Sequence, residues 1–473
     1  MNTKALRQKI LDLAIHGKLV PQDPNDEPAS VLLEHIRAEK ERLIKEGKIK
    51  KPKKSKAACD KPHYPFELPK GWEWTTVGEI SWDLVYGTSK KSSSNGEIPV
   101  LRMGNINRCG KIDWNNLVYT SDKDDITKYS LQTNDLLFNR TNSNEWVGKT
   151  AIYKGEKTAI YAGYIVRLRV IILDADYVNF VMNSSYYRGW CNDVKTDAVN
   201  QSNINAQKLS HFFIPIPPLN EQKRIVNELS SWLNIIEAIN KEKSDLQSTI
   251  CLAKSKILDL AIHGKLVPQD PNDEPASELL KRINPKAEIT CDNPQYPFEL
   301  PKGWEWTTLG EIGEIITGNT PSKDNKEYYG GNIPFFKPTD LEQGIDTKFS
   351  NDKLSQLGFE SSRKLPANTV LVTCIGATIG KTGLISVEGS CNQQINAIVP
   401  TKSIIPYFLY YACVSKYMQN EIKSNASATT LPILNKGNFS KIAFPLPPLS
   451  EQHRIVAKIE ELFAQLDKIE ASL

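Results

Sequence analysis

Part of this sequence occurs twice, and the duplication limits the folds that the chain can adopt. Residues 10–30, ILDLAIHGKLVPQDPNDEPAS, recur unchanged as residues 257–277. Two further blocks recur almost unchanged: YPFELPKGWEWTTVGEI of 64–80 at 296–312, and IPIPPLNEQKRIV of 214–226 as FPLPPLSEQHRIV at 444–456. Between these blocks the two copies have nearly equal lengths but hardly similar sequences. We infer a fixed scaffold that carries two variable modules.

The repeat also relates the two ends of the chain to its middle. Segment 449–473 followed by the N-terminal segment reproduces the central segment from residue 219 onward, and only residues 244–247 lack a counterpart. The sequence therefore behaves as a ring that is cut inside one of two equivalent connectors. We infer that the termini lie near each other and that the molecule has a pseudo-two-fold axis.

The central connector, about residues 219–263, has the apolar spacing of a coiled coil over five heptads. Pro217 and Pro218 precede it and Gly264 follows it, which predicts one helix about 65 Å long. The terminal segments carry a matching pattern, so we expect them to pair antiparallel with the central helix. The alternative is amphipathic helices that each pack on their own domain. The predicted coiled-coil interface consists of Leu6, Ile10, Leu13, Ile225, Leu229, Trp232, Ile236, Ile239, Leu246, Ile250, Ile257, Leu260, Ile455, Ile459, Leu462, Leu466 and Ile469.

The variable modules combine short β-like runs with shorter helical stretches. The predicted fold class is mixed α/β: two globular α/β domains joined by two long antiparallel coiled-coil helical connectors. The predicted parts are an N-terminal helix, loop and basic insertion (1–63), a first α/β domain (64–218), a central helix and loop (219–295), a second α/β domain (296–448) and a C-terminal helix (449–473).

The basic insertion, residues 37–56, holds ten Lys or Arg and three Glu. We expect a solvated, partly helical tail that touches a partner or the backbone of a nucleic acid, if one is bound, without contributing to its recognition. The alternative, that it touches nothing, stays open.

Composition excludes several classes of protein. Lys and Arg total 59 against 55 Asp and Glu, so the net charge of +4 excludes a uniformly basic nucleic-acid coat. No apolar stretch approaches the roughly 18 residues of a membrane span. The eight cysteines form no C-x-x-C pair, which favours reduced thiols in the cytoplasm over disulfides or structural zinc.

Loops of both modules are rich in side chains that bond phosphates and base edges. Ordinary solvated turns use the same residue types, so this alternative stays open loop by loop. The candidate DNA-binding residues are Thr88, Ser89, Lys90, Lys91, Arg102, Asn105, Asn107, Arg140, Asn142 and Asn144 in the first module, and Thr317, Asn319, Thr320, Ser322, Lys323, Lys337, Thr339, Gln393 and Gln394 in the second.

No catalytic site is evident. GATIGKT (376–382) has three residues where a phosphate-binding P-loop needs four, and its counterpart NSNEWVGKT has no leading glycine, so both are interpreted as turns. His16 and His263 end helices without a carboxylate and a nucleophile beside them, which favours a role near the helix dipole. We predict no catalytic residue and no metal site.

The repeated blocks, the two divergent inserts and the coiled-coil connectors resemble the specificity subunit of a type I restriction–modification enzyme. GKLVPQDPNDEPAS, PFELPKGWEWTTVGEI, TGNTPSK, IGKT and IPIPPLNEQKRIV carry the resemblance over essentially the whole chain. It departs in the first module, where YGTSKKS lacks the proline that follows Thr320.

The resemblance implies two target recognition domains that each read half of a bipartite, asymmetric site on double-stranded DNA. It implies two methylation subunits docked along the helices and restriction/translocase subunits that join them. S-adenosylmethionine, ATP and Mg²⁺ then belong to these partners, and this chain is not an enzyme. The rival interpretations are a coiled-coil scaffold for proteins without DNA specificity and a self-contained nuclease or methyltransferase.

Overall fold

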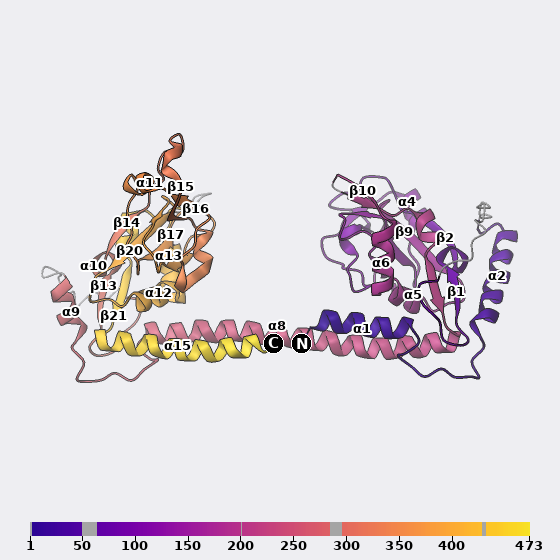
Figure 1. Ribbon diagram of the computed structural model, residues 1–473, viewed down its shortest axis with the longest axis horizontal. Helices are drawn as coiled ribbons and strands as arrows, with labels where there is room; N and C mark the ends of the chain where they lie inside the picture. The colour runs from indigo at the N-terminus through magenta and orange to yellow at the C-terminus, as the bar shows by residue number, and fades with distance from the viewer. Residues whose placement is uncertain (1, 50–63, 200, 284–295, 428–431) are drawn as a thin grey trace. The chain divides into compact units, whose positions relative to one another are not determined.

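The computed structural model describes residues 2–49, 64–199, 201–283, 296–427 and 432–473. The chain divides into two compact units, Met1–Glu242 and Lys243–Leu473 (Figure 1). Each unit contains one α/β domain and one pair of long helices.

The predicted central connector is a single helix, α8 (Leu219–Ile262), of 44 residues. Pro217 and Pro218 precede it, where their missing N–H groups cost no intrahelical hydrogen bond. Gly264 ends it with a φ of 63°, and the N–H of Lys265 donates to the carbonyl of Leu260 at 2.8 Å. A left-handed residue at this place stops the helix, because it turns the chain away while the last carbonyls stay bonded.

In the first unit, α1 (Thr3–Ile15) lies antiparallel to the first part of α8 (Figure 1). Thr3 Oγ1 donates to Asn240 Oδ1 at 2.7 Å, near one end of the pair. Near the other end, Arg224 forms an ion pair of 2.6 Å with Asp26, in the loop that follows α1. The predicted antiparallel pairing is therefore confirmed in this unit.

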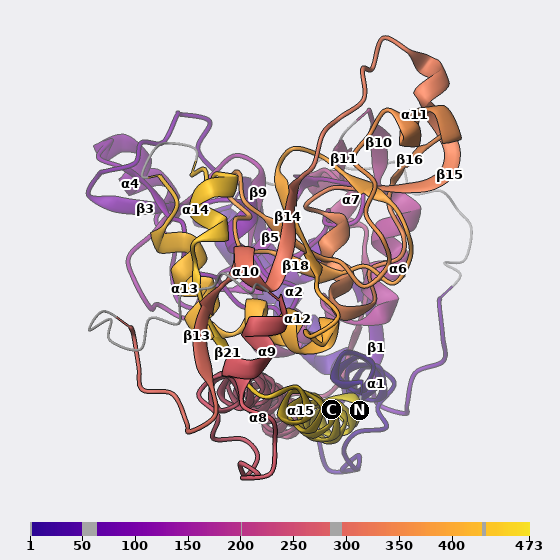
Figure 2. The same ribbon diagram turned by 90° about the vertical axis from the view of Figure 1, so that its left-hand side faces the viewer.

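In the second unit, α15 (Leu449–Ala471) lies beside the last part of α8 (Figure 2). Lys254 forms an ion pair with Asp467 at 2.6 Å, and Arg454 forms one with Asp273 at 2.6 Å. The chain directions are again antiparallel. The second ion pair repeats that of Arg224 with Asp26, as the duplicated sequence predicts.

Three residues of the predicted coiled-coil interface are exposed in the structure. Trp232, Leu246 and Ile469 are exposed at 40%, 38% and 45%. Leu233 is buried in place of Trp232, together with Ile225, Leu229 and Ile236. The buried row of this part of α8 therefore departs from the predicted interface at one position, because Leu233 joins the core of the α/β domain.

The first domain contains two main sheets and several short helices. A four-stranded antiparallel sheet has the order β2-β9-β5-β7, and a three-stranded sheet has the order β4-β3-β8 with β3 and β8 parallel. The strands of these two sheets are β2 (Ser81–Tyr86), β9 (Ile165–Val170), β5 (Leu136–Asn139), β7 (Thr150–Ile152), β4 (Val118–Thr120), β3 (Ile98–Leu101) and β8 (Ile160–Tyr161). The helices are α3 (Val77–Ile80), η1 (Met103–Asn105), α4 (Lys123–Tyr129), α5 (Ala175–Val181), α6 (Ser185–Val194) and α7 (Ala206–Ser210).

The second domain repeats this topology although its sequence has diverged. Its sheets have the orders β14-β20-β17-β18 and β16-β15-β19, again with one parallel pair, β15 and β19. The strands are β14 (Gly313–Thr317), β20 (Ile395–Pro400), β17 (Val370–Thr373), β18 (Thr382–Leu384), β16 (Asp352–Leu354), β15 (Tyr329–Phe336) and β19 (Ser390–Cys391). The helices are α10 (Leu309–Ile312), η2 (Lys326–Tyr328), η3 (Asp340–Asp346), α11 (Gln356–Glu360), α12 (Pro406–Val414), α13 (Lys416–Ser424) and α14 (Lys436–Ser440).

Each domain closes on itself through a pair of strands from its two ends. The Trp-Glu-Trp strand β1 (Glu73–Thr76) pairs with β12 (Phe213–Ile216), and β13 (Glu305–Thr308) pairs with β21 (Ala443–Leu446). A further small sheet, β10 (Thr196–Ala198), β11 (Gln201–Asn203) and β6 (Thr141–Asn142), occurs in the first domain. The variable sequence is therefore held between two strands of the repeated scaffold.

The central strands divide the core of each domain into two layers. In β5, Leu136 and Phe138 join the large cluster that includes the helices, whereas Leu137 joins a smaller cluster over the three-stranded sheet. This division follows from the strand period of two, which sends neighbouring side chains to opposite faces. In β17, Val370 and Leu371 divide in the same way.

A buried glutamate links each domain to the start of its long helix. Trp72 Nε1 donates to Glu221 at 3.1 Å, and Trp304 Nε1 donates to Glu451 at 2.9 Å. A glutamine from the loop after the preceding helix donates to each carboxylate as well: Gln22 at 3.3 Å and Gln269 at 3.2 Å. Burial raises the pKa of Glu221 and of Glu451. The repeated sequence blocks thus build the same domain-to-helix joint twice.

The basic insertion is partly helical, as expected, but part of it is packed rather than solvated. Helix α2 (Ala29–Lys45) buries Leu43, and Lys40 Nζ donates to the carbonyls of Gly78 and Glu79. Its counterpart in the second unit, α9 (Ala276–Ile283), is shorter because it lacks the insertion. Residues 50–56 lie outside the described part of the chain.

Several expectations concern absences. Among the described residues, no helix is both long and apolar enough to span a membrane, and no group of His, Cys, Asp or Glu is arranged to hold a metal ion. The six described cysteines are free: Cys109, Cys191, Cys251, Cys374, Cys391 and Cys413. Cys59 and Cys291 lie outside the described residues.

Candidate nucleic-acid interface

Each domain has a cleft at the same place in its fold. The first cleft, of 470 Å³, is lined by residues that include Thr88, Ser89, Lys90, Arg102, Gly163 and Tyr164. The second cleft, of 590 Å³, is lined by residues that include Thr320, Lys323, Lys337, Asp352, Gln393 and Gln394. Nine of the predicted DNA-binding residues lie in these two clefts, although they come from loops that are far apart in the sequence.

A glycine after the first strand of each main sheet shapes each cleft. A Cβ atom on Gly87 would overlap the carbonyl oxygens of Tyr161 and Ala162, and one on Gly318 would overlap those of Cys391 and Asn392. Neither glycine has a positive φ, so close backbone approach and not backbone conformation excludes a side chain. These glycines hold the two walls of each cleft together.

The opposite wall is a tight turn, residues 162–165 in the first domain and 392–395 in the second. The N–H of Ile165 donates to the carbonyl of Ala162 at 2.9 Å, and the N–H of Ile395 donates to that of Asn392 at 3.2 Å. Two flanking backbone hydrogen bonds also match. The N–H of Ala162 donates to the carbonyl of Leu101, as that of Asn392 does to Phe336. The carbonyl of Tyr164 accepts from the N–H of Arg140, as that of Gln394 does from Cys374. Gly163 therefore corresponds to Gln393 and Tyr164 to Gln394. We name these the tip residues.

In the first cleft, an acidic helix engages the candidate residues. Thr88 is buried and its hydroxyl donates to Asp125 of α4. Lys90 forms an ion pair of 2.7 Å with Asp122, and the Lys90 ammonium lowers the pKa of that carboxyl. A phosphate at Lys90 would have to compete with Asp122, whereas Ser89 and the neighbouring Lys91 are exposed.

In the second cleft, the polar groups are held by one another. Thr320 Oγ1 donates to Gln393 Oε1 at 2.6 Å, and Asn392 Nδ2 donates to Gln394 Oε1 at 2.9 Å. Lys337 forms an ion pair with Asp352, and Lys323 is exposed at the margin. The amide groups are therefore oriented before any ligand is present.

Other predicted residues support the loops rather than face a ligand. Asn105 is buried and its amide donates to the carbonyls of Asp113 and Asn115, both at 2.9 Å. Asn319 accepts from the N–H of Arg363 at 2.8 Å, and Thr317 donates to Asn396 at 2.7 Å. The expectation that these three side chains face DNA conflicts with these bonds, because their polar atoms are used within the domain.

The remaining predicted residues lie outside the clefts. Asn107 accepts from two backbone N–H groups of its own loop, Ser322 and Asn142 each accept from one, and Thr339 is exposed. Arg140 lies over the ring of Tyr86, 4.9 Å from its centroid.

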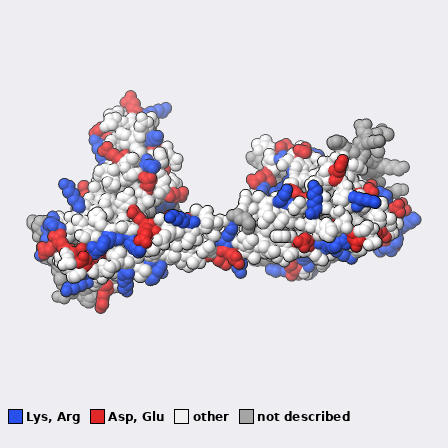
Figure 3. All heavy atoms as spheres, turned by 60° about the horizontal axis from the view of Figure 1, so that its bottom comes forward, with Lys and Arg blue, Asp and Glu red and all other residues white. Residues whose placement is uncertain are grey.

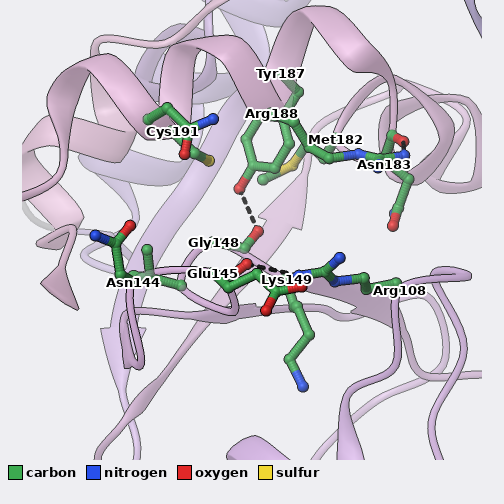
Figure 4. Close-up of a pocket in the computed structure, with 12 residues that line it drawn as sticks. Arg108, Asn144, Glu145, Gly148, Lys149, Met182, Asn183, Tyr187, Arg188 and Cys191 are labelled. Carbon is green, nitrogen blue, oxygen red and sulfur yellow. Dashed lines mark hydrogen bonds and ion pairs between the residues drawn. The ribbon is translucent and has the colours of Figure 1, made fainter. Parts of the chain in front are cut away.

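A third cavity, of 440 Å³, lies between α6 and the 143–149 turn of the first domain (Figure 4). Asn144 lines this cavity together with Arg108, Arg188 and Cys191, while the Lys149 side chain points away from it. Arg108 lies 4.0 Å from the ring centroid of the half-exposed Trp146. Arg108 and Trp146 end the polar loop runs RMGNINR (102–108) and NRTNSNEW (139–146), but neither is among the residues predicted to bind DNA.

The two GKT segments are turns, as predicted. Gly148 and Gly380 have φ values of 87° and 91°, which suit glycine. Lys149 Nζ donates to the carbonyls of Met103 and Ile106, and Lys381 forms an ion pair of 2.8 Å with Glu342. Neither lysine is presented to a phosphate by a glycine-rich loop before a helix, which is what a P-loop requires.

The tip residues Gly163 and Tyr164 were also missed. Tyr164 is 54% exposed beside the first cleft. An alignment of IYAGYI with SCNQQI, anchored on the repeated blocks, would have placed Tyr164 opposite Gln394. Charges of both signs are interspersed on the face of each unit that Figure 3 shows, so neither unit is uniformly basic there.

The comparisons with known proteins agree with this architecture. The family model for the type I restriction modification DNA specificity domain matches twice, at residues 69–248 and 301–473. The chain is 30% identical to the EcoAI specificity subunit of Escherichia coli, over 98% of this chain and 90% of that protein. It is 28% identical to the EcoEI specificity subunit of the same species, over 99% and 90%.

The fold is also similar to a solved structure. A chain from a study of complex assembly and conformational transition of the type I R-M system aligns with a TM-score of 0.61 and 19% identity, over 86% of this chain and 94% of the other. At this identity the likeness supports the fold alone. The two matches of the family model and the identity to the EcoAI subunit show the family: this chain belongs to the type I restriction–modification DNA specificity subunits.

Proposed function

We propose that the first and second clefts each contact one half of a bipartite, asymmetric DNA site, and that this chain contributes sequence recognition without catalysis. The observation that carries the proposal is the pair of matched clefts with different side chains on a duplicated scaffold. A symmetric pair of binding sites would serve a symmetric ligand, whereas different linings suit two different half-sites.

The chemistry of the clefts suits DNA. Arg and Lys bind phosphates and guanine edges, Asn and Gln bind adenine, and Ser and Thr bind either. The second cleft offers amides and lysines, and the first offers hydroxyls, Arg102 and an aromatic ring. The third cavity, with Arg108 and Arg188, suits a backbone phosphate beside the first half-site.

Partners of the chain follow from its family. We infer that two methylation subunits dock along the helix pairs and that restriction/translocase subunits join this core. The exposed apolar residues of α8, Trp232 at 40% and Ile235 at 47%, support a partner surface there, because apolar side chains of this size seldom cluster on a free helix face. S-adenosylmethionine, ATP and Mg²⁺ are then bound by the partners.

The test uses the full chain with and without its methylation partner. Mobility shifts on genomic DNA fragments, followed by methylation profiling of DNA from cells that carry both subunits, should give one asymmetric, two-part motif. Labelled S-adenosylmethionine should bind the complex and not the chain alone. A protein scaffold without DNA specificity would give no sequence motif, and a self-contained enzyme would bind the cofactor by itself.

A further inference from the structure

The two tip residues of each recognition cleft differ between domains whose backbones match around them. Three matched hydrogen bonds hold the turn in both domains, and the glycine of the opposite wall approaches it about equally closely. Because the backbone of the turn matches while its side chains differ, the turn holds different side chains at the same place in the two domains. These residues are Gly163 and Tyr164 in the first domain and Gln393 and Gln394 in the second.

Gln393 is held for recognition by its neighbour. The Thr320 hydroxyl donates to Gln393 Oε1 at 2.6 Å, which fixes the plane of the amide at the mouth of the second cleft. One lone pair of Oε1 and both N–H groups of the amide stay available, since the Thr320 hydroxyl uses only one acceptor position. An oriented amide of this kind matches the adenine edge, donating to N7 while accepting from the N6 amino group.

We propose that the tip residues are specificity determinants: Gln393 reads an adenine of the second half-site, Thr320 positions it, and Tyr164 contributes to reading the first half-site. The inference rests on the proposed function of the clefts. In the first domain Gly163 has no side chain, so the matching position cannot form the same bidentate contact. There the exposed ring of Tyr164 is the group that can meet a base edge, and the apolar partner it suits is a thymine methyl.

The experiment measures binding by the full chain with its methylation partner. The reference duplex carries the motif that methylation profiling gives for the wild-type complex, and a panel replaces each base pair of both half-sites in turn. The Gln393→Ala variant should lose discrimination at one adenine-containing base pair of the second half-site by about 5- to 150-fold, with the first half-site unchanged. Tyr164→Ala should change the first half-site alone, so each variant is the control for the other.

Two further variants separate reading from support. Gln393→Glu keeps the shape but offers only acceptors, so its preference at the same base pair should move towards cytosine, whose N4 amino group donates. Thr320→Val should weaken discrimination at that base pair, and Thr320→Ser, which keeps the hydroxyl, should restore it. Gln356→Ala, an exposed glutamine of α11 outside the cleft, should leave the panel unchanged.

Each outcome of the experiment decides the inference. If Gln393→Ala weakened the binding of every duplex equally, Gln393 would be a contact to the DNA backbone and the inference would be overturned. Unchanged binding across the panel, or an effect on the first half-site, would overturn it as well. If the wild-type complex itself showed no preference across the panel, the proposed function would fail instead. Thermal unfolding and assembly with the partner, measured on every variant, show that the folded complex is being compared.

Discussion

At the residue scale, burial of the glutamates in the two joints disfavours their ionised form. Glu221 and Glu451 accept hydrogen bonds from a tryptophan and a glutamine, yet burial raises their pKa. A carboxyl whose folded pKa lies above its ordinary value of 4.5 binds more protons in the folded state. Its contribution to stability is therefore present at low pH and is lost as the pH rises through the raised value.

This sign gives a prediction for Glu221→Gln. The free energy of unfolding of the wild type, minus that of the variant, should decrease from pH 4.5 towards neutral pH, because only the wild type must keep a buried charge. Urea unfolding at several pH values measures the difference, and Glu451→Gln should repeat it in the second unit. A difference that increases with pH would mean that the ionised carboxylate stabilises the joint.

A second prediction at this scale concerns the glycine of the first cleft. Gly87→Ala should lower the free energy of unfolding by about 1–3 kcal/mol, because its methyl group would collide with backbone carbonyls that cannot move alone. Gly104→Ala, where a Cβ atom meets nothing within 4 Å, is the matched control and should change stability by less than about 0.5 kcal/mol. Equal effects of the two substitutions would contradict the close approach at Gly87.

At the scale of elements, α8 presents two kinds of apolar residue with different roles. Ile236 is buried in the core of the first unit, whereas Trp232 is exposed and its indole donates to Glu228 of the same helix at 2.8 Å. We therefore expect only the first of these to be needed for the chain to fold. The second is available to a partner.

The contrast predicts opposite phenotypes for two substitutions on one helix. Ile236→Ala should cost about 2–5 kcal/mol of stability, as for other large-to-small changes in a core. Trp232→Ala should leave the thermal unfolding of the chain almost unchanged and should reduce co-purification with the methylation subunit. If Trp232→Ala destabilised the isolated chain as much as Ile236→Ala did, the face that carries Trp232 would belong to the core of this chain.

At the scale of the whole molecule, modularity follows from the way each domain is closed. The variable sequence begins after β1 and ends at β12, and these two strands pair with each other. A domain bounded by its own strand pair can be exchanged without changing the helices. Because the scaffold is duplicated, we expect such exchange to be possible in each of the two domains.

The corresponding prediction is an exchange of residues 72–215 for the equivalent segment of another family member. One half of the methylated motif should change and the other half should stay the same, as read by methylation profiling. Simultaneous change of both halves would contradict independent recognition by the two domains.

The length of α8 gives a different whole-molecule prediction. Insertion of one helical turn beside Ser244 adds about 5.4 Å of rise, which corresponds to rather more than one and a half base pairs. The spacer between the half-sites should change while both half-sites stay as they were. An altered half-site with an unchanged spacer would contradict the role of α8 as a spacer.

The architecture could be predicted from the amino-acid sequence, because the signals for it are local or repeated. The heptad spacing and the flanking Pro217, Pro218 and Gly264 defined α8, and identical blocks had to form identical joints, as Trp72–Glu221 and Trp304–Glu451 show. The family resemblance rested on the same blocks. It is confirmed by the two matches of the family model and by the identity to the EcoAI specificity subunit over nearly the whole chain.

The polar residues that line the clefts could be told from those that support the loops only after the chain was seen folded. Thr88, Asn105 and Asn319 are residue types that commonly bind DNA. Their side chains instead form hydrogen bonds with other residues of the chain, namely Asp125, Asp113 and Arg363. The tip residue Tyr164 carries no sequence signal of its own, since its place depends on backbone contacts between β8 and the loop after β2. The physical reason is common to all of these residues: a local pattern records periodicity and propensity, whereas the use of a polar side chain depends on which distant groups packing brings within hydrogen-bonding distance.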